Sequence, residues 1–330
     1  MFNFRNMKHT LVLLAVILIY IPKTFSQEYI SDSLMSVFVE SGFANEHFIP
    51  KGKLKNGERV GKWTDYSFEF IPTYEQDENE IIDEWYEHIL ICSEGKYVRN
   101  QKNGVWKFFA LEGRALNKYH IADVTFKNDE KNGPVTLFYS TGEKAAETFY
   151  KNGLLHGEYT MFYKTGEVVR KYEMVEDTMQ GQLTFFYRTG ERKLTMNFID
   201  GIRTGESKGY YKNGDIKSTK TYVDDSVQGF CTFYYPNGKI QEVGLYKNGI
   251  LTSLKYYYES GQLWVSKVYR KGKYFNVLEL YDSEGNSLDF GTLKDGTGTV
   301  KFYTQDAEVY LIRTYEEGEI INEEYFDEFK

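Results

Sequence analysis

The sequence holds one string typical of a hydrolytic nucleophile. Gly205-Glu-Ser207-Lys-Gly209 matches the G-x-S-x-G pattern, in which the serine is exposed at a sharp turn between a strand and a helix. Here the string lies inside a segment that repeats elsewhere in the chain and alternates as a strand does. We therefore interpret Ser207 as a strand residue and expect no catalytic role for it.

Other residues able to bind metals or phosphate lack the required spacing. The histidines after residue 26 form no H-x-x-H or H-E-x-x-H pattern, as a zinc hydrolase would need. Residues 291–298 are rich in glycine but lack the Lys-Ser/Thr of a phosphate-binding loop. Cys92 and Cys231 could pair in an oxidising compartment, but Cys231 falls at a predicted core position far along the chain from Cys92, which favours two free thiols. The sequence predicts no enzyme, no metal and no cofactor.

Composition and charge exclude several classes of protein. Among 330 residues, Tyr 29, Phe 24 and Trp 4 give 17% aromatics, and 27% are charged, which excludes a disordered chain and a multi-span membrane protein. The formal net charge is −8, and it falls to −11 if residues 1–26 are removed. An acidic surface repels nucleic acid and anionic lipid headgroups. We expect neither as a partner.

The first 26 residues predict a Sec signal peptide. Arg5 and Lys8 form a positive region, residues 11–21 are an uninterrupted apolar run, and small residues precede a cleavage position before Gln27. The apolar run is too short to span a bilayer stably. We expect an exported protein, periplasmic or extracellular; an uncleaved anchor is the alternative.

An internal repeat organises most of the chain. Five hexapeptides share an aromatic pair and a glycine: F-Y-S-T-G-E from Phe138, F-Y-K-T-G-E from Phe162, F-Y-R-T-G-E from Phe186, Y-Y-K-N-G-D from Tyr210 and Y-Y-P-N-G-K from Tyr234. Their glycines recur at intervals of 24 residues. A leading glycine precedes each by nine residues, at Gly133, Gly157, Gly181, Gly205 and Gly229. Weaker copies continue through 257–261 and 281–285.

Each repeat predicts a β-hairpin. Residues 157–163 alternate with period two and are rich in aromatics and Thr, as a strand would be. A short connection ending in glycine leads to a second strand from Glu167 toward Met174, and an Asp/Gly turn returns the chain. The predicted fold is all-β: an elongated, open antiparallel β-meander of tandem β-hairpin repeats, each about 24 residues long.

Side-chain alternation predicts two faces for this sheet. Counting from the leading glycine, positions +2, +4 and +6 share one face and are predicted to be buried. Position +6 is Tyr in all five copies, and position +2 holds Val135, Tyr159, Leu183, Ser207 and Cys231. The opposite face is lined at +3 by Thr in four copies and by Lys208 in the other, and by large rings at +5. We name these rings the +5 ladder: Phe138, Phe162, Phe186, Tyr210 and Tyr234.

The +5 ladder is the predicted partner-binding surface. Exposed apolar stripes usually mark contact surfaces, and aromatic residues are enriched at interface hot spots. The alternative is that sheet twist buries the rings beneath side chains of the second strand, so that they complete the fold.

The repeats resemble the bacterial variant of the MORN repeat, with its Gly-x-W/Y-x-x-Y-Y-x-N-G core. The best match spans residues 133–249, and residues 56–63 and 102–106 carry the same signature. The resemblance covers most of residues 51–318. It implies a structural repeat with varied functions: eukaryotic members look like membrane-apposed scaffolds, and many bacterial relatives carry the label of a toxin–antitoxin system antitoxin. The resemblance assigns no functional residue.

An acidic insertion interrupts the first repeats. Residues 64–95 contain ten acids and no Lys or Arg, which predicts a hairpin whose tip is lengthened by an acidic loop from Pro72. The loop is a candidate contact for a cation or a basic partner, and a solvated loop is the alternative. It lacks the spacing of a calcium-binding EF-hand loop. Its candidate residues are Glu75, Asp77, Glu78, Glu80, Asp83 and Glu84.

The predicted organisation and function follow from these features. The segments are a signal peptide at 1–26, an N-terminal segment at 27–50, degenerate repeats at 51–132 with the acidic insertion at 64–95, regular repeats at 133–252, and degenerate C-terminal repeats with an acidic cap at 253–330. We predict an exported, non-enzymatic scaffold for protein–protein interaction, with an unidentified protein partner. An immunity or antitoxin-like protein that occludes a toxin, and an aromatic surface that binds a glycan, are the alternatives.

Overall fold

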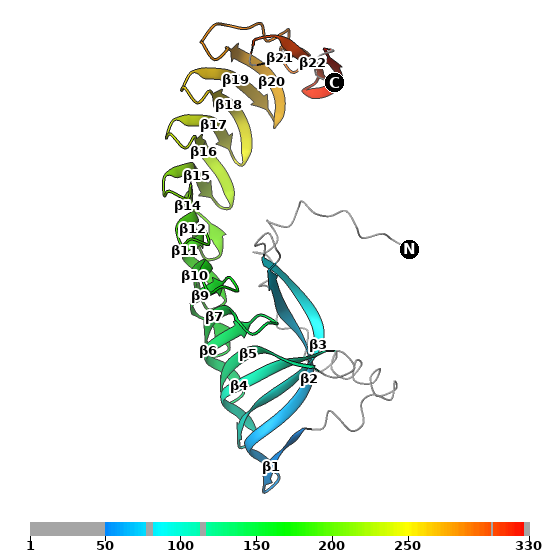
Figure 1. The fold of residues 1–330 in the computed structure, drawn as a ribbon, viewed down its shortest axis with the longest axis vertical. Coiled ribbons are helices and arrows are strands. Elements are labelled where there is room, and N and C mark those ends of the chain that lie inside the picture. Colours follow the sequence, from blue (N-terminus) through cyan, green and yellow to red (C-terminus); the bar gives the residue numbers. More distant parts are fainter. Residues whose placement is uncertain (1–49, 77–81, 113–116, 305, 327–330) are drawn as a thin grey trace, which may run out of the picture. The chain divides into compact units, whose positions relative to one another are not determined.

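The computed structural model describes residues 50–76, 82–112, 117–304 and 306–326 (Figure 1). Within these residues the regular elements are all strands, and no helix could cross a membrane. The predicted signal peptide and its cleavage position lie outside the described residues. The chain divides into unit 1, residues 1–166 with 174–177, and unit 2, residues 167–173 with 178–330.

Consecutive strands pair antiparallel in each unit and form an open sheet, which confirms the predicted β-meander of hairpins. The strands of unit 1 are β1 (Lys51–Lys55), β2 (Glu58–Gln76), β3 (Ile82–Val98), β4 (Gln101–Glu112), β5 (Asn117–Lys127), β6 (Glu130–Phe138), β7 (Lys144–Lys151), β8 (Leu154–Leu155) and β9 (Gly157–Phe162). Strand β10 (Val168–Val175) has residues in both units.

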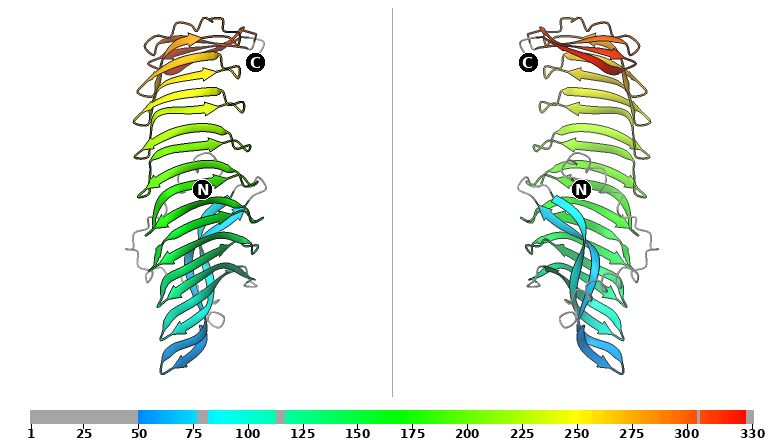
Figure 2. Two further views of the ribbon diagram at one scale, coloured as in Figure 1. Left: turned by 90° about the vertical axis from the view of Figure 1, so that its left-hand side faces the viewer. Right: turned by 90° about the vertical axis from the view of Figure 1, so that its right-hand side faces the viewer.

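Unit 2 continues the hairpins and adds a second sheet. Its strands are β11 (Thr178–Phe186), β12 (Arg192–Ile199), β13 (Ile202–Arg203), β14 (Gly205–Tyr210), β15 (Ile216–Val223), β16 (Ser226–Tyr234), β17 (Ile240–Lys247), β18 (Ile250–Tyr257), β19 (Leu263–Arg270), β20 (Lys273–Leu280), β21 (Gly298–Tyr303), β22 (Val309–Glu316) and β23 (Glu319–Tyr325). Figure 2 shows the hairpins of this unit side by side, with turns alternating between two edges of the sheet. Strands β21 to β23 form a separate three-stranded sheet.

The predicted turns have the backbone that the sequence indicated. Between β12 and β13, Asp200 and Gly201 have φ angles of 50° and 77°, as a two-residue type I′ turn requires. At the other edge, the Gly166 N–H donates to the Tyr163 carbonyl at 2.8 Å. Each leading glycine also has a positive φ, for example 72° at Gly205, a conformation that costs a residue with a Cβ more than it costs glycine.

The +2 column is buried in all five regular repeats, as predicted. Trp63 and Trp106 extend it into the first repeats, where Tyr97 packs edge-on against both rings at centroid distances of 5.9 and 5.0 Å. These rings belong to a buried cluster of unit 1 that includes Ile91 and Val124. Position +2 of the repeat therefore marks core residues in each unit.

The prediction of one buried and one exposed face is only partly correct. Phe185 at +4 and Tyr187 at +6 are half-buried, whereas Thr184 at +3 on the opposite face is buried. Thr184 lies directly opposite Thr195, which is also buried. A threonine side chain is short, so longer neighbours on the same face shield it from water. The larger apolar side chains of a single-layer sheet stay partly exposed, because no second layer covers them.

The acidic insertion is a long hairpin rather than a loop that begins at Pro72. Strands β2 and β3 pair without interruption from Gly61 opposite Tyr97 to Gln76 opposite Ile82 (Figure 1). Pro72 lies opposite Tyr86 inside this ladder. The segment is rich in aromatic and β-branched residues, which favour strand pairing despite the acids.

The candidate acidic residues divide between strands and undescribed positions. Glu75, Asp83 and Glu84 lie in the paired strands, with Glu75 opposite Asp83. Asp77, Glu78 and Glu80 lie outside the described residues, so their candidacy stays a prediction.

The meander of hairpins ends at β20. Beyond it, residues 281–297 form turns and isolated bridges, and β21 to β23 then pair with one another. A buried cluster joins the two sheets of unit 2, with Val265 and Val277 from the meander and Leu293, Val300 and Tyr315 from the last segment. The last segment thus adds a packed second layer that the repeat pattern did not predict.

Candidate functional site

All five residues of the +5 ladder are half-buried. In unit 1 the Phe138 ring stacks on His120, with centroids 4.3 Å apart, and Phe109 lies 5.1 Å from the same imidazole. The Lys144 ammonium lies 5.4 Å from the centroid of the Phe162 ring. Side chains of the neighbouring strands therefore cover part of each of these rings, and part remains open.

Phe109 extends the ladder by one position that sequence reasoning missed. It follows Gly104 by five residues, the spacing that defines the ladder in the regular repeats. The repeat signature at residues 102–106 indicated this position. The ladder was defined by the aromatic pair of the hexapeptide, and that pair is absent here because Phe109 is followed by Ala110.

The +6 tyrosines hold consecutive repeats together. The Tyr139 hydroxyl donates to the carbonyl oxygen of Phe162 at 2.6 Å, and Tyr187 donates to that of Tyr210 at 2.7 Å. In both pairs the acceptor is the +5 residue of the next repeat. Burial raises the pKa of Tyr139 to about 12, with smaller contributions from Tyr163 and Glu143. The tyrosines thus fix the backbone from which the ladder rings project.

The inter-repeat turns are joined in a similar way at the other edge. The Asp225 N–H donates to the Arg203 carbonyl at 3.1 Å, and Asp225 Oδ1 accepts from the N–H and the Nε of Arg203 at 3.1 and 2.8 Å. The hydrogen bond from Arg203 is the main cause that lowers the pKa of Asp225. Asp177 makes the same exchange with the backbone of Leu155.

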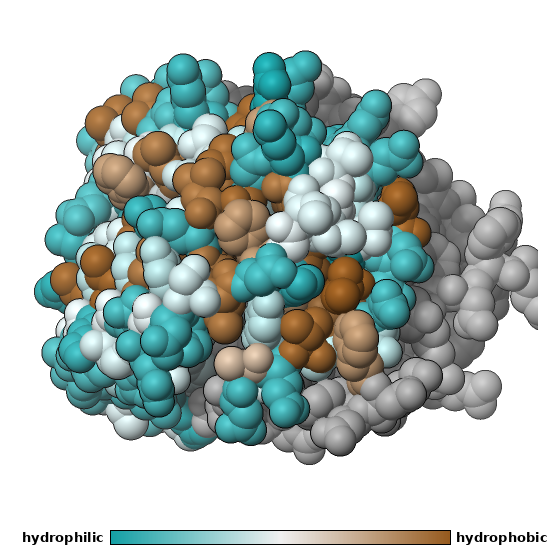
Figure 3. Space-filling view, turned by 90° about the horizontal axis from the view of Figure 1, so that it is seen from above, coloured by the Kyte–Doolittle hydropathy of each residue, from teal (hydrophilic) through white to brown (hydrophobic). Residues whose placement is uncertain are grey.

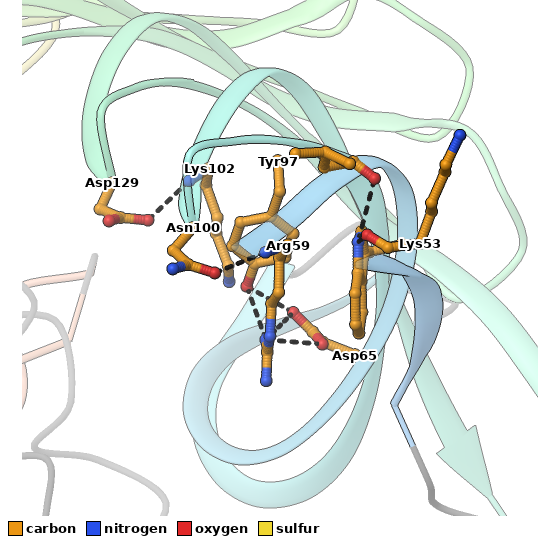
Figure 4. A network of polar contacts seen from close by, with 9 residues as sticks. Lys53, Arg59, Asp65, Tyr97, Asn100, Lys102 and Asp129 are labelled. Atoms are coloured by element: carbon orange, nitrogen blue, oxygen red, sulfur yellow. Dashed lines mark hydrogen bonds and ion pairs between the residues drawn. The ribbon is translucent and has the colours of Figure 1, made fainter. Parts of the chain in front are cut away.

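A polar network occupies the same position at the first repeats (Figure 4). The Arg59 guanidinium lies 4.9 Å from the Trp63 ring centroid and 5.3 Å from that of Tyr97. Arg59 Nη1 donates to Asp65 and to the Tyr97 hydroxyl, each at 3.2 Å, and Tyr97 donates to Asp65 at 2.6 Å. Burial and Asp65 raise the pKa of Tyr97 to about 12. The network closes the edge of the aromatic core, and the described side chains hold no group of metal ligands.

Ser207 occupies a core position and the two thiols are free. Ser207 is 2% exposed in strand β14, opposite Lys220, and no helix follows it among the described residues. This is the strand context predicted from the sequence. Cys92 and Cys231 are both free and buried, and burial raises the pKa of each thiol.

A row of exposed aliphatic side chains follows the turn edge of unit 2. Strand alternation places it on the face of the ladder: Ile199 shares its face with Thr195 and lies opposite Ile202. We define this edge row as Ile199, Ile202, Val223 and Ile250, which are 60, 43, 49 and 48% exposed. Phe230, at position +1 of the same face, is 65% exposed. The face therefore combines half-buried rings with exposed apolar side chains.

Comparison with known proteins identifies the repeat. Four segments of the chain match the MORN repeat variant, at residues 131–152, 155–175, 203–224 and 229–248. No curated protein matches the chain.

Two solved structures show low similarity to the chain. One is titled "Structure of Photorhabdus luminescens Tc holotoxin pore, Mutation TccC3-D651A", with 10% identity and a TM-score of 0.16 over 77% of this chain and 14% of that one. The other is titled "Crystal Structure of TcdB2-TccC3-Cdc42", with 9% identity and a TM-score of 0.13 over 78% of this chain and 21% of that one. The chain thus spans less than a quarter of either, and TM-scores this low carry no argument about its fold or function.

Proposed function

Because the chain carries repeats of the MORN variant, we propose that it is an exported, non-enzymatic scaffold that binds a protein partner. MORN repeats are modules that typically mediate protein interactions. Residues of the repeat pattern serve the fold, since Tyr187 and Asp225 each join one hairpin to the next. The function is then carried by residues that the fold does not use.

The observation that supports this proposal best is the exposure of Phe230 together with the edge row. Phe230 presents 65% of its surface on the face that also carries the +5 ladder. A soluble protein gains nothing in stability from such exposed rings, and contiguous apolar patches usually mark interfaces. Aromatic anchors surrounded by aliphatic side chains are typical of protein-binding surfaces.

A protein fits this surface better than a glycan. A sugar ring stacks on an open aromatic face, but the Phe138 face is already stacked on His120. The acidic net charge of −8 disfavours nucleic acid and anionic lipid. An apolar face on an acidic molecule suits a protein partner with an apolar patch and a basic rim.

The test is cross-linking of the mature chain in producing cells, followed by binding measurements with the purified partner. Phe230→Ser with Val223→Ser should weaken binding by about ten-fold or more, as loss of a hot spot does. Leu54→Ser, which alters a side chain that is 59% exposed in unit 1, is the matched control. A glycan-array signal with no stoichiometric protein partner would favour the carbohydrate alternative, and a captured toxin whose activity the chain blocks would favour the immunity alternative.

Phe162→Ala with Phe186→Ala separates the two roles of the ladder. If the ladder binds the partner, the pair should abolish binding and preserve the melting temperature. A large loss of thermal stability would assign the rings to the fold and leave Phe230 and the edge row as the site.

A further inference from the structure

A cavity of about 430 Å³ lies in unit 2 between the end of the meander and the three-stranded sheet. Its walls come from β19, β20, β21 and β22 and from Gly318 and the start of β23. They carry Lys267, Tyr269, Tyr274, Phe302, Arg313, Tyr315, Glu319 and Ile320. Glu319 is paired with Lys273 at 3.0 Å. Figure 3 views the end of the molecule that carries β21 to β23 and shows apolar side chains gathered among polar ones. The cavity is lined by tyrosine and phenylalanine rings, two cationic side chains and the carboxylate of Glu319.

Lys267 is a half-buried cation in the middle of β19. It lies opposite Leu254 and Val277, both buried. Its ammonium lies 5.3 Å from the Tyr256 ring centroid and 5.5 Å from that of Tyr274. In the described part of the chain no carboxylate lies within ion-pair distance of it. Burial lowers the pKa of Lys267, Arg313 lowers it further, and Glu242 opposes them only in part.

Two other polar groups of the cavity, Tyr274 and Arg313, have unused hydrogen-bonding capacity. The Tyr274 hydroxyl is buried and has no hydrogen-bond partner, although buried polar atoms nearly always have one. Arg313 donates from Nε to Glu323 Oε1 at 2.7 Å and lies 4.9 Å from the Phe302 ring centroid. Arg313 also interacts with the side chain of Tyr315. A guanidinium has five N–H donors, so donors remain for a further acceptor.

We propose that this cavity binds a small organic carboxylate, whose anionic group pairs with Lys267 and Arg313 and whose ring or apolar body lies against the tyrosines. A bound anion would offset the unfavourable free energy of burying the Lys267 charge and would reduce the repulsion between the two cations. The Tyr274 hydroxyl would supply a donor to it. Arg313 already binds a carboxylate of this chain, Glu323, which indicates the acceptor type that suits it. The site is independent of the proposed scaffold function and lies outside the edge row.

The test is calorimetric titration of the mature chain with benzoate, glucuronate and inorganic phosphate. At least one carboxylate should bind saturably, and Lys267→Met should weaken it by about ten-fold or more because a charge-assisted contact is lost. Lys255→Met is the matched control, because Lys255 is exposed and lies opposite Ser266 and Val243 on the other face. Glu323→Gln should tighten binding, because it removes the carboxylate that competes for Arg313.

Protonation of Lys267 gives a second readout. Its pKa is lowered in the free protein, so carboxylate affinity should fall as pH rises through that pKa, and the bound ligand should raise it. Nuclear magnetic resonance of ¹³C-methylated lysines measures this, with the Lys267 signal assigned by its absence in Lys267→Met. No saturable binding up to about 10 mM, a range that includes even weak sites, would overturn the proposal. So would equal affinity in a folded Lys267→Met, or binding of phosphate alone.

Discussion

The Tyr187 hydroxyl donates a hydrogen bond to the main-chain carbonyl oxygen of Tyr210, 2.7 Å away and 23 residues further along the chain. The same relationship joins Tyr235 to Tyr257 at 2.7 Å and Tyr258 to Tyr281 at 3.0 Å. A recurring tyrosine thus links one hairpin to its successor at these positions. This is how a repeat array is stabilised, by interfaces between neighbours rather than by one central core.

Two substitutions of Tyr187 should separate the contribution of its ring to stability from that of its hydroxyl. Tyr187→Ala should cost about 3 kcal/mol, because it removes a large ring from the sheet. Tyr187→Phe should cost about 1 kcal/mol, the usual net value of one hydrogen bond. Urea unfolding followed by circular dichroism measures both. Equal costs for the two variants would show that the hydrogen bond, and not the ring, carries the contact.

The turn contact of Asp225 should depend on pH. Its pKa is lowered below the ordinary value of 3.8, chiefly by the hydrogen bond from Arg203. Its stabilising contribution is therefore present above about pH 4 and is lost as pH falls through the lowered folded-state pKa. Asp225→Asn should destabilise by less than about 1 kcal/mol at pH 7, because the carboxylate is half exposed.

Urea midpoints at pH 7 and near pH 2 check this dependence. The difference between the wild-type chain and Asp225→Asn should disappear at the lower pH. A difference that persists there would mean that charge plays no part in the turn contact.

Ser207→Ala should leave the protein almost unchanged. The hydroxyl lies in a column filled elsewhere by Val135 and Leu183, so the free energy of unfolding should change by less than about 1 kcal/mol in either direction. Chemical denaturation and a panel of ester and peptide substrates measure the two properties. A hydrolytic activity that is present in the wild-type chain and absent in Ser207→Ala would contradict a non-enzymatic scaffold.

Export should remove residues 1–26. The charged, apolar and small-residue zones predict cleavage before Gln27, so intact mass of protein recovered outside the cytoplasm should begin at that residue. A soluble product that retains residues 1–26 would contradict both the cleavage and the localisation that we propose. Substitution of Ser26 by a bulky residue should block processing, whereas the same change at Gln27 is the milder control.

The hairpins could be predicted because the residue types of each repeat indicate where its turns and its core positions lie. Asp200 and Gly201 adopt the left-handed backbone that their residue types favour, and the +2 column is buried throughout. These features are local in sequence, and repetition made them visible. The hydrogen bond from Tyr187 to Tyr210 could not be read from the pattern, because it depends on where one repeat places its ring relative to the next.

The features that were missed depend on contacts between segments outside the repeat. Pro72 signalled a loop, yet the aromatic residues around it extend the pairing of β2 and β3 past it. Lys267 carried no signal, because it is one lysine in a degenerate repeat. Lys267 becomes a candidate carboxylate-binding residue only because β21 and β22 bring Phe302 and Arg313 against the end of the meander. The candidate cavity is a product of tertiary packing.

Gly209 and Ser218 provide the sharpest test of side-chain packing within a repeat. Gly209 replaces the hydrophobe expected at +4 and lies directly opposite Ser218. A Cβ at position 209 would lie 2.6 Å from Ser218 Oγ but 3.8 Å from Ser218 Cβ, so only the hydroxyl stands in its way. Gly209→Ala alone should therefore be neutral or destabilising. In the Ser218→Ala background the same change should stabilise by about 0.5 to 1 kcal/mol, since glycine in a strand loses more entropy on folding than alanine.

A double-mutant cycle from urea unfolding measures the coupling between the two positions. We expect a favourable coupling of about 1 kcal/mol, as for other residues in direct contact. Additivity within about 0.3 kcal/mol, the behaviour of distant sites, would show that the Ser218 side chain turns away at little cost. The absence of a hydrophobe at +4 would then have a cause other than the space occupied by its cross-strand neighbour.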